Sequence, residues 1–380
     1  MGLRDTPMNL LVDENVYAAR ETFSKLGNAA LVPGREIDNR RCRNADALIV
    51  RSTTKVTREL LEGTPVSFIG TATTGDDHID ASAARDHGAA LAVARGCNAE
   101  AVVDYTVAAI VRYAARRGVR LRGATVGVIG VGRIGSRVAE VFEKLGARVF
   151  RNDPPRRDRG DEGDWRDLRD ALAADVVTIH TPLTDDGDYP TRRLLGEKEL
   201  RAIRPDAALV NAARGGVIDY AALERRLDDD PPAFILDVFE SEPDFNVALA
   251  KRAFLATPHI AGYSLEGKAN GTRMIYDALC RFLGVEPTPL PELPTPENSE
   301  IDARPKGSLE ETLDAAVAEA YDVLRDDRAM KAAADADDRG KAFDELRKAY
   351  PLRREFSNYA ARTNDEETLA ALAAIRFRVI

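Results

Sequence analysis

The chain has 380 residues, which is enough for two or three domains that each bury a hydrophobic core. Its residues are 44% hydrophobic and 31% charged, as is typical of a globular protein, and its formal net charge is −9, which gives no general attraction for nucleic acid or an anionic membrane. The 3 cysteines and 4 histidines show no paired spacing, so we expect neither a disulfide framework nor a bound metal.

No apolar run reaches the length that spans a membrane. Residues 1–11 are too short and too charged for a signal peptide. We therefore expect a cytoplasmic location, with no nucleic acid and no membrane as partner.

Short apolar runs alternate with helical segments through the first 97 residues. The helical segments cover residues 16–26 and 81–87. This alternation predicts a small doubly wound sheet. Its four predicted strands are residues 10–12, 47–50, 66–69 and 91–93.

A long helix is predicted next, over residues 98–118, because Asn98 is a good N-cap and apolar residues recur on one face. It leads into residues 125–153, the most informative part of the chain. There an apolar strand, a glycine-rich turn, an amphipathic helix over 133–145 and a second strand follow one another, and Asp153 ends the second strand.

This order of elements meets the structural requirements of dinucleotide binding. Gly130 permits the turn, Gly132 allows the backbone to approach a pyrophosphate, and Gly135 allows the helix to pack against the strand. The N–H groups at the start of the helix, at Arg133 and Ile134, would then face the phosphates.

The choice of cofactor is predicted from Asp153. Its carboxylate is placed to accept hydrogen bonds from both hydroxyls of an adenosine ribose, and it would repel a 2′-phosphate. We therefore predict NAD rather than NADP. The alternative is an ordinary strand–helix–strand unit with a glycine-rich turn.

Polar residues follow three of the later predicted strands, at the edge where open α/β sheets build their sites. Arg214 offers a planar, two-pronged grip on a carboxylate. His259 is a candidate acid and base because histidine titrates near neutral pH, and Glu242 could orient its ring. Together the three suit oxidation of a 2-hydroxy acid, although each alone could be an ordinary surface or turn residue. The later strands are residues 176–179, 207–210, 233–236 and 254–256.

The last third of the chain begins with a second amphipathic helix, predicted over residues 265–283. Prolines recur between 287 and 296 and predict a stiff, extended linker. Residues 300–380 are rich in charge and helical in the middle, so we expect a third domain there.

Further motifs lie at residues 11–15, 50–56, 70–75, 96–99, 153–156, 158–164 and 258–268. With the glycine turn and the three polar residues, they resemble the D-isomer-specific 2-hydroxyacid dehydrogenase family. The likeness runs from about residue 9 to 285 and returns at 321–323 and 346–350. Two departures are visible, since Ala213 stands where cysteine is frequent and Phe239 where tryptophan is frequent. The pattern starts at Met8, so residues 1–7 are expected to be an extension.

The resemblance implies an α/β fold with two doubly wound parallel-sheet domains, a flavodoxin-like substrate domain and a Rossmann NAD domain, plus a C-terminal α/β dimerisation domain. The substrate domain would comprise residues 1–97 and 262–286, the NAD domain 98–261, and the dimerisation domain 287–380. It also implies NAD as cofactor, a small phosphorylated hydroxy acid as substrate, and a homodimer.

The resemblance assigns roles to particular residues. The catalytic positions are matched by Arg214, Glu242 and His259. The substrate contacts are matched by Ser52, Thr73 and Tyr263. Together with the glycine turn, the predicted cofactor contacts are Gly130, Gly132, Arg133, Ile134, Gly135, Asp153, Thr181, Ala212, Ala213, Arg214, Asp237 and Gly262.

A substrate phosphate needs at least one Arg or Lys beside it. Arg51 and Lys55 flank Ser52 and are the first candidates, and Arg353 and Arg354 are the second. Two alternatives stay open: a phosphoglycerate or other D-2-hydroxyacid dehydrogenase, and a catalytically idle protein that binds NAD as a sensor.

Overall fold

The computed structural model describes residues 7–380, so the expected extension over residues 1–7 lies outside the described residues except for Pro7. The chain divides into two compact units. The first unit comprises the residues up to Asn98 together with Ser264–Pro294, and the second unit comprises Ala99–Tyr263 and Thr295–Ile380.

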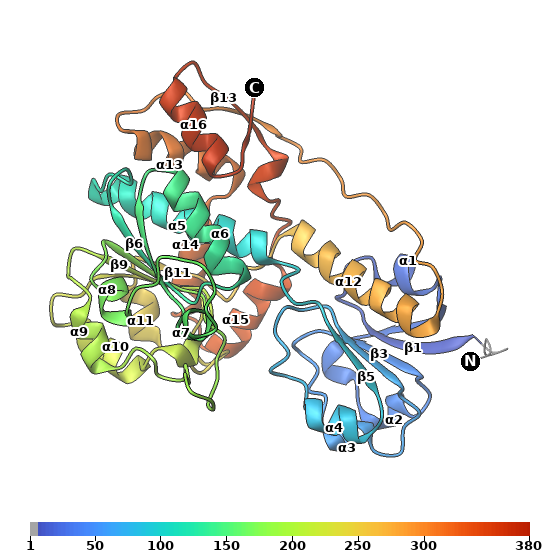
Figure 1. Ribbon diagram of the computed structural model, residues 1–380. Coiled ribbons are helices and arrows are strands. Elements are labelled where there is room, and N and C mark those ends of the chain that lie inside the picture. Colours follow the sequence, from blue (N-terminus) through green and yellow to red (C-terminus); the bar gives the residue numbers. More distant parts are fainter. Residues whose placement is uncertain (1–6) are drawn as a thin grey trace. The chain divides into compact units, whose positions relative to one another are not determined.

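The first unit contains a five-stranded parallel sheet in the order β2-β1-β3-β4-β5 (Figure 1). This is the flavodoxin-like doubly wound order, as predicted. The strands are β1 (Met8–Asp13), β2 (Gly27–Val32), β3 (Ala47–Val50), β4 (Phe68–Thr71) and β5 (Ala90–Val93). The helices are α1 (Ala19–Phe23), α2 (Asn39–Cys42), α3 (Arg58–Leu61), α4 (Ala81–Asp86) and α12 (Leu265–Leu283), with a short 3₁₀ helix at Gly34–Glu36.

Helices cover both faces of this sheet, so its central strands are buried on both sides. Along β3, Ile49 packs in one apolar cluster with residues of α12, whereas Leu48 and Val50 pack in another with residues of α2, α3 and α4. The sequence prediction missed strand β2, which lies at the edge of the sheet and is only partly buried, with Asn28 and Ala30 exposed. The predicted helix over residues 16–26 is correspondingly shorter, since the chain leaves α1 early to form β2.

The second unit contains a six-stranded parallel sheet in the order β11-β10-β9-β8-β6-β7. A parallel bridge between Arg151 and Trp165 lies beyond β7, in the place of the third strand of a Rossmann sheet. The strands are β6 (Thr125–Ile129), β7 (Arg148–Asn152), β8 (Val176–Ile179), β9 (Ala208–Asn211), β10 (Ala233–Leu236) and β11 (Leu255–Ala256). The helices are α5 (Ala99–Arg117), α6 (Arg133–Lys144), α7 (Pro154–Asp158), α8 (Leu168–Leu172), α9 (Glu197–Ala202), α10 (Tyr220–Arg226) and α11 (Val247–Arg252), with a 3₁₀ helix at Gly215–Val217.

Residues 295–380 belong to the same compact unit and add a small parallel sheet in the order β12-β13-β14. Its strands are β12 (Glu300–Asp302), β13 (Ala360–Arg362) and β14 (Arg378–Val379). The helices of this segment are α13 (Leu309–Ala320), α14 (Val323–Ala333), α15 (Arg339–Lys348) and α16 (Glu366–Ala374), with a 3₁₀ helix at Phe356–Asn358.

Helix α5 is buried almost all round, although its sequence predicts a single apolar face. The apolar residues of α13, including Leu313, share one core cluster with those of α5 and of the six-stranded sheet. Polar groups are paired across the same contact. The Arg112 guanidinium lies 2.9 Å from a carboxylate oxygen of Asp314, and Glu310 accepts a hydrogen bond of 2.8 Å from the Leu121 N–H.

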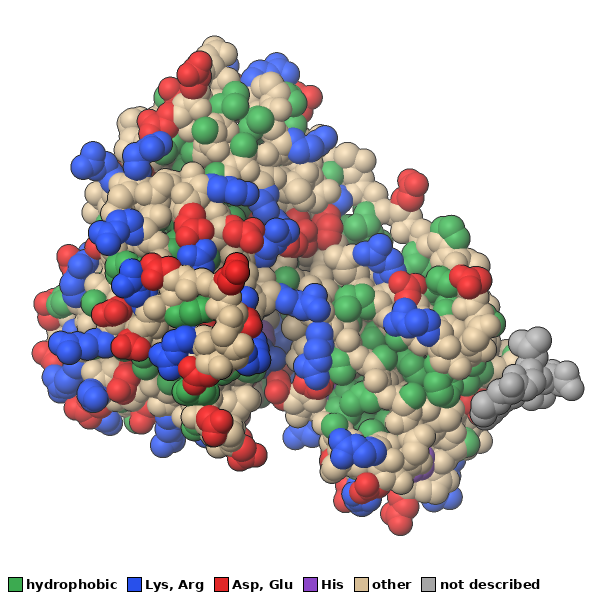
Figure 2. Space-filling model, viewed as in Figure 1, with side chains coloured by type: hydrophobic (Ala, Val, Ile, Leu, Met, Phe, Trp, Pro, Cys, Tyr) green, Lys and Arg blue, Asp and Glu red, His purple; other side chains and the backbone are tan. Residues whose placement is uncertain are grey.

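The surface is polar and carries charges of both signs. In Figure 2, the Lys and Arg side chains are mixed with the Asp and Glu side chains over the face shown. Within residues 7–380, no helix is both long enough and apolar enough to cross a membrane.

The buried contact of α13 with α5 predicts that Leu313→Ala destabilises the second unit. Leu313 is 0% exposed, and truncating a buried leucine costs about 2–5 kcal/mol because a cavity remains. Urea denaturation followed by circular dichroism measures the loss. Leu352→Ala is the matched control, since Leu352 is 69% exposed and its truncation should change the free energy of unfolding by less than about 0.5 kcal/mol. Equal unfolding midpoints for the two variants would contradict this core contact.

Candidate active site

The predicted cofactor and catalytic residues of the second unit follow the carboxyl ends of its strands, in loops or, for Arg133, Ile134 and Gly135, at the start of α6. The glycine turn follows β6, and it requires glycine at two positions. Gly130 has a φ of +84°, and a Cβ there would lie 2.8 Å from the His180 carbonyl carbon. A Cβ at Gly135 would lie 2.0 Å from the Gly130 carbonyl oxygen, which shows how closely α6 packs against β6.

The space in front of α6 suits a pyrophosphate. A Cβ at Gly132 would meet no heavy atom within 4 Å, and Gly132 has no side chain with which to cap the helix. The N–H groups at the start of α6, at Arg133 and Ile134, therefore receive no side-chain cap from the N-cap residue. An open, uncapped N-terminus of a 12-residue helix fits an anionic group.

Asp153 lies beside the glycine turn, directly after β7. One carboxylate oxygen accepts a hydrogen bond of 2.8 Å from the Val131 N–H, and the other accepts one of 3.1 Å from the Arg156 N–H. The carboxylate thus joins the glycine turn to the start of α7. This is the edge at which the ribose of a dinucleotide would lie.

His180 and Thr181 follow β8 on the other side of the glycine turn. Burial lowers the pKa of His180 to about 3, so its ring is neutral at pH 7. Its Nε2 lies 3.0 Å from the Thr178 hydroxyl. Within residues 7–380, the buried Thr181 hydroxyl has no hydrogen-bond partner, which fits its predicted role as a cofactor contact.

The loop after β9 presents Ala212, Ala213 and Arg214. The Asn211 side chain shapes this loop, because it accepts from the Ala213 N–H at 3.1 Å and donates to the Arg214 carbonyl at 3.0 Å. The Arg214 side chain is half-buried, and its guanidinium donates to the Ala213 carbonyl at 2.8 Å. Gly215 follows, where a Cβ would lie 2.2 Å from the Phe239 backbone, so the loops after β9 and β10 are in close contact.

Asp237 is fully buried after β10 and organises the loop that carries His259. It accepts hydrogen bonds from the Thr257 hydroxyl at 2.7 Å, the Ile260 N–H at 2.8 Å and the Ala261 N–H at 2.9 Å. Burial raises the pKa of Asp237 to about 6, against the opposing influence of His259 and of these hydrogen bonds.

Glu242 and His259 form a direct pair. His259 Nδ1 lies 2.6 Å from Glu242 Oε2, and Glu242 Oε1 accepts a hydrogen bond of 2.8 Å from the Phe239 N–H. Burial would raise the pKa of Glu242, but the neighbouring His259, the Phe239 N–H and the charge of Arg347 hold it below its usual value. Glu242 is therefore a carboxylate at neutral pH and fixes the proton on Nδ1, which leaves Nε2 as the basic atom of the ring.

Tyr263 follows Gly262 at the end of the same loop and is held by α15 and the residues after it. Its hydroxyl accepts a hydrogen bond of 3.2 Å from Arg347, and its ring meets the Tyr350 ring edge to face at 5.7 Å. The sequence reasoning did not single out Arg347. The available signal was the family likeness at residues 346–350, since no local pattern connects α15 with Tyr263.

Arg353 and Arg354 were the second candidates for the phosphate, and the structure does not favour them. Both are buried, at 5% and 8% exposure. Arg353 donates to the carbonyls of Ala101 and Ala261, and its guanidinium lies 4.5 Å from the centre of the Tyr321 ring. Arg354 donates to the Asn358 side chain at 3.0 Å. Both arginines serve internal contacts instead.

The predicted substrate contacts of the first unit lie after neighbouring strands. Ser52 follows β3 and is exposed, while Thr73 follows β4 and its hydroxyl lies 2.7 Å from that of Thr71. Arg51 is half-buried and Lys55 is exposed. Each is thus at the carboxyl edge of the sheet, and the roles of these four residues stay predictions.

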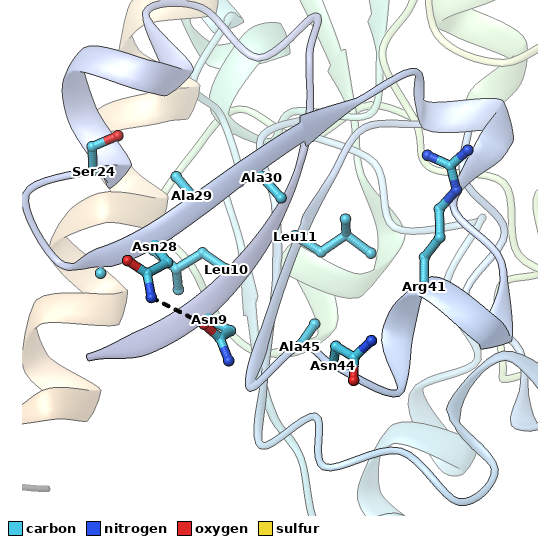
Figure 3. A pocket seen from close by; sticks show the side chains of 11 residues that line it. Asn9, Leu10, Leu11, Ser24, Asn28, Ala29, Ala30, Arg41, Asn44 and Ala45 are labelled. Atoms are coloured by element: carbon cyan, nitrogen blue, oxygen red, sulfur yellow. Dashed lines mark hydrogen bonds between the residues drawn. The ribbon is translucent and has the colours of Figure 1, made fainter. Parts of the chain in front are cut away.

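A hollow of about 680 Å³ in the first unit is lined by none of these residues (Figure 3). It lies beside the amino-terminal halves of β1 and β2, where Asn28 donates a hydrogen bond of 3.2 Å to Asn9. Open α/β sheets bind ligands at the opposite ends of their strands. We therefore assign this hollow no part in the site.

Known proteins share this fold. The sequence model described as D-isomer specific 2-hydroxyacid dehydrogenase, NAD binding domain, matches residues 88–261, and a model for a domain of unknown function matches residues 292–375. The NAD⁺-bound 3-phosphoglycerate dehydrogenase of Entamoeba histolytica is 25% identical, with a TM-score of 0.63 over 73% of this chain and 96% of that one. The D-lactate dehydrogenase of Aquifex aeolicus, in complex with NAD and lactic acid, is 25% identical with a TM-score of 0.61 over 73% and 95%.

The chain also resembles complete proteins over its whole length. Erythronate-4-phosphate dehydrogenases of Salmonella typhi and Salmonella typhimurium are each 46% identical to it over 378 residues, which cover 98% of this chain and 99% of theirs. The chain therefore belongs to the D-isomer-specific 2-hydroxyacid dehydrogenase family. The predictions of fold class, of an NAD-dependent dehydrogenase and of NAD as cofactor are confirmed.

The position of Asp153 predicts that Asp153→Ser weakens the preference for NAD. Serine can still cap α7, so the loop should keep its fold, while the charge that repels a 2′-phosphate is lost. The ratio of kcat/KM with NAD to kcat/KM with NADP should fall. Asp164→Ser, at an exposed acid of the following loop, should leave this ratio unchanged. An unchanged ratio in Asp153→Ser would mean that Asp153 does not lie at the ribose.

The Glu242–His259 pair predicts a change in the pH profile of Glu242→Gln. Hydroxy-acid oxidation needs neutral His259, so its rate rises with pH. Because the pKa of Glu242 is lowered, the native residue is charged throughout this rise and stabilises protonated His259. Removing the charge lets the ring lose its proton more readily, so the half-maximal rate should move to lower pH. Glu240→Gln, at an exposed neighbour, is the control and should keep the native pH profile. A native pH profile in Glu242→Gln would contradict the pairing of Glu242 with His259.

Proposed function

We propose that the protein oxidises 4-phospho-D-erythronate at C2 to (R)-3-hydroxy-2-oxo-4-phosphooxybutanoate with NAD, as a step of pyridoxal 5′-phosphate biosynthesis. The substrate is supported by the relatives named erythronate-4-phosphate dehydrogenase, which are 46% identical over 98% of the chain. The chemistry is carried by one observation, the 2.6 Å contact of His259 Nδ1 with Glu242 Oε2.

In this proposal, three side chains have separate catalytic roles. Arg214 binds the substrate carboxylate with its planar guanidinium. To do so, it gives up its hydrogen bond to the Ala213 carbonyl. His259 accepts the C2 hydroxyl proton at Nε2, and Glu242 stabilises the imidazolium that forms. Bound NAD supplies the acceptor for the hydride that leaves C2. Hydride and proton thus leave from opposite ends of the same H–C–O–H unit, and the C2 hydroxyl becomes a carbonyl.

The cofactor is proposed to lie across the carboxyl edge of the six-stranded sheet. Gly130, Gly132, Arg133, Ile134 and Gly135 would face its phosphates, with Asp153 at the ribose. The further contacts proposed on the other side are Thr181, Ala212, Ala213, Arg214, Asp237 and Gly262. Ser52, Thr73 and Tyr263 are proposed to contact the substrate, and Arg51 and Lys55 remain candidates for its phosphate.

The proposal also includes a cytoplasmic homodimer in which residues 287–380 hold two subunits together. The separate sequence model that matches residues 292–375 supports a distinct role for this segment. Within one chain, however, α13 and α16 of this segment contact the NAD-binding part. Sedimentation of the full chain across a range of concentrations measures the oligomeric state, and a monomer throughout would contradict this part.

A substrate panel tests the function. With NAD in excess, formation of NADH at 340 nm should be much faster with 4-phospho-D-erythronate than with D-3-phosphoglycerate, D-lactate or unphosphorylated D-erythronate. His259→Asn should lower kcat by about 10²–10⁴-fold while leaving NAD affinity nearly unchanged, because only the base is lost. Preference for 3-phosphoglycerate would favour a phosphoglycerate dehydrogenase. NAD binding without turnover of any hydroxy acid would favour the sensor.

A further inference from the structure

Arg347 brings the C-terminal segment of the second unit to a residue of the candidate site. It lies in the last turn of α15, and its guanidinium donates a hydrogen bond of 3.2 Å to the Tyr263 hydroxyl. The guanidinium carbon is 5.8 Å from the centres of both the Tyr263 and the Phe343 rings. Two rings and one hydrogen bond therefore fix the direction of this side chain.

Nearby Glu242 favours the charge of Arg347, but no direct salt bridge to Arg347 forms among residues 7–380. Within the same residues, its buried Nε has no hydrogen-bond partner. A buried N–H without a partner is unfavourable, because it has lost its hydrogen bonds to water. An anion bound beside Arg347 would make this arrangement more favourable.

Within residues 7–380, Arg112 Nε, Arg353 Nη1 and Arg376 Nε are likewise buried without a hydrogen-bond partner, but these three arginines have other polar contacts. Arg112 pairs with Asp314 at 2.9 Å, Arg376 pairs with Asp104 at 2.7 Å, and Arg353 donates to two carbonyls. Arg347 instead contacts rings and a neutral hydroxyl. Burial opposes its charge, while Tyr263 and Glu242 favour it and keep the pKa of Arg347 above its usual value, so Arg347 is charged.

We propose that Arg347 is a specificity-determining residue, which holds the Tyr263 hydroxyl in place and binds the phosphate group of the substrate. The guanidinium has five N–H donors in a planar fork that matches phosphate oxygens, and only one of its contacts is needed for Tyr263. Hydrogen bonding to the cation also makes the Tyr263 hydroxyl a stronger donor to an anion. This inference rests on the proposed function, since it assumes a phosphorylated substrate and a substrate contact at Tyr263.

The test compares 4-phospho-D-erythronate with unphosphorylated D-erythronate in Arg347→Met. Methionine keeps an unbranched apolar stem and removes the charge. A hydrogen bond to a charged group contributes about 1.5–3 kcal/mol, so kcat/KM for the phosphorylated substrate should fall by about 10- to 150-fold, mainly through KM. The fall for erythronate should be far smaller. Arg347→Lys should recover part of the lost selectivity, because it restores the charge without the fork.

Lys348→Met is the matched control. It removes one positive charge from the next position of the same helix, where the side chain is exposed, so the ratio of the two efficiencies should equal that of the native chain. Tyr263→Phe removes the hydroxyl and keeps the ring, and it should lower the ratio by less than Arg347→Met does. Thermal midpoints and NAD affinity, measured on every variant, identify any variant that fails to fold. If Arg347→Met fails to fold, the selectivities of Arg347→Lys and Tyr263→Phe test the proposal.

The outcomes separate this inference from the function on which it rests. If the native chain does not prefer the phosphorylated acid, the proposed function fails. Suppose instead that the native chain prefers the phosphorylated acid, and that Arg347→Met lowers kcat/KM equally for both acids or for neither. The proposed function then stands, and Arg347 does not bind the phosphate. A fall confined to the phosphorylated substrate supports the proposal.

Discussion

The candidate site depends on the buried carboxylate of Asp237. The carboxylate accepts three hydrogen bonds, from Thr257, Ile260 and Ala261. The backbone carbonyl of Asp237 accepts a fourth, from the His259 N–H at 2.7 Å. These bonds hold His259 in a left-handed conformation with a φ of +56°, which is rare for a residue other than glycine. Without them the backbone would relax, and His259 would lose its fixed approach to Glu242.

The same loop is held from outside by the last quarter of the chain. Asp327 accepts a hydrogen bond of 2.8 Å from the Ala256 N–H, Arg353 donates to the Ala261 carbonyl, and Arg347 donates to the Tyr263 hydroxyl. The end of β11, at Ala256, and two parts of the loop that follows it are thus tied to the C-terminal segment. This segment therefore supports the geometry of the candidate site as well as covering α5.

The predictions that the structure or the comparisons confirm were those based on local patterns. The glycine turn, the apolar runs and the helix Leu265–Leu283 each combine a short period with a recognisable beginning or end. Strand β2 was missed; it is an edge strand that is only partly buried. Helix α5 was predicted with one apolar face, since the sequence does not reveal that α13 covers the other.

The sequence by itself determined the dinucleotide fold, the cofactor and the order of the polar residues after the strands, because each follows from spacing within a few tens of residues. Only the tertiary structure decided which distant groups meet. It placed Arg353 and Arg354 in internal contacts and brought Arg347 to Tyr263. Such contacts depend on the packing of α14 and α15 against the loop after β11, and packing between segments so far apart leaves no periodic trace in the sequence.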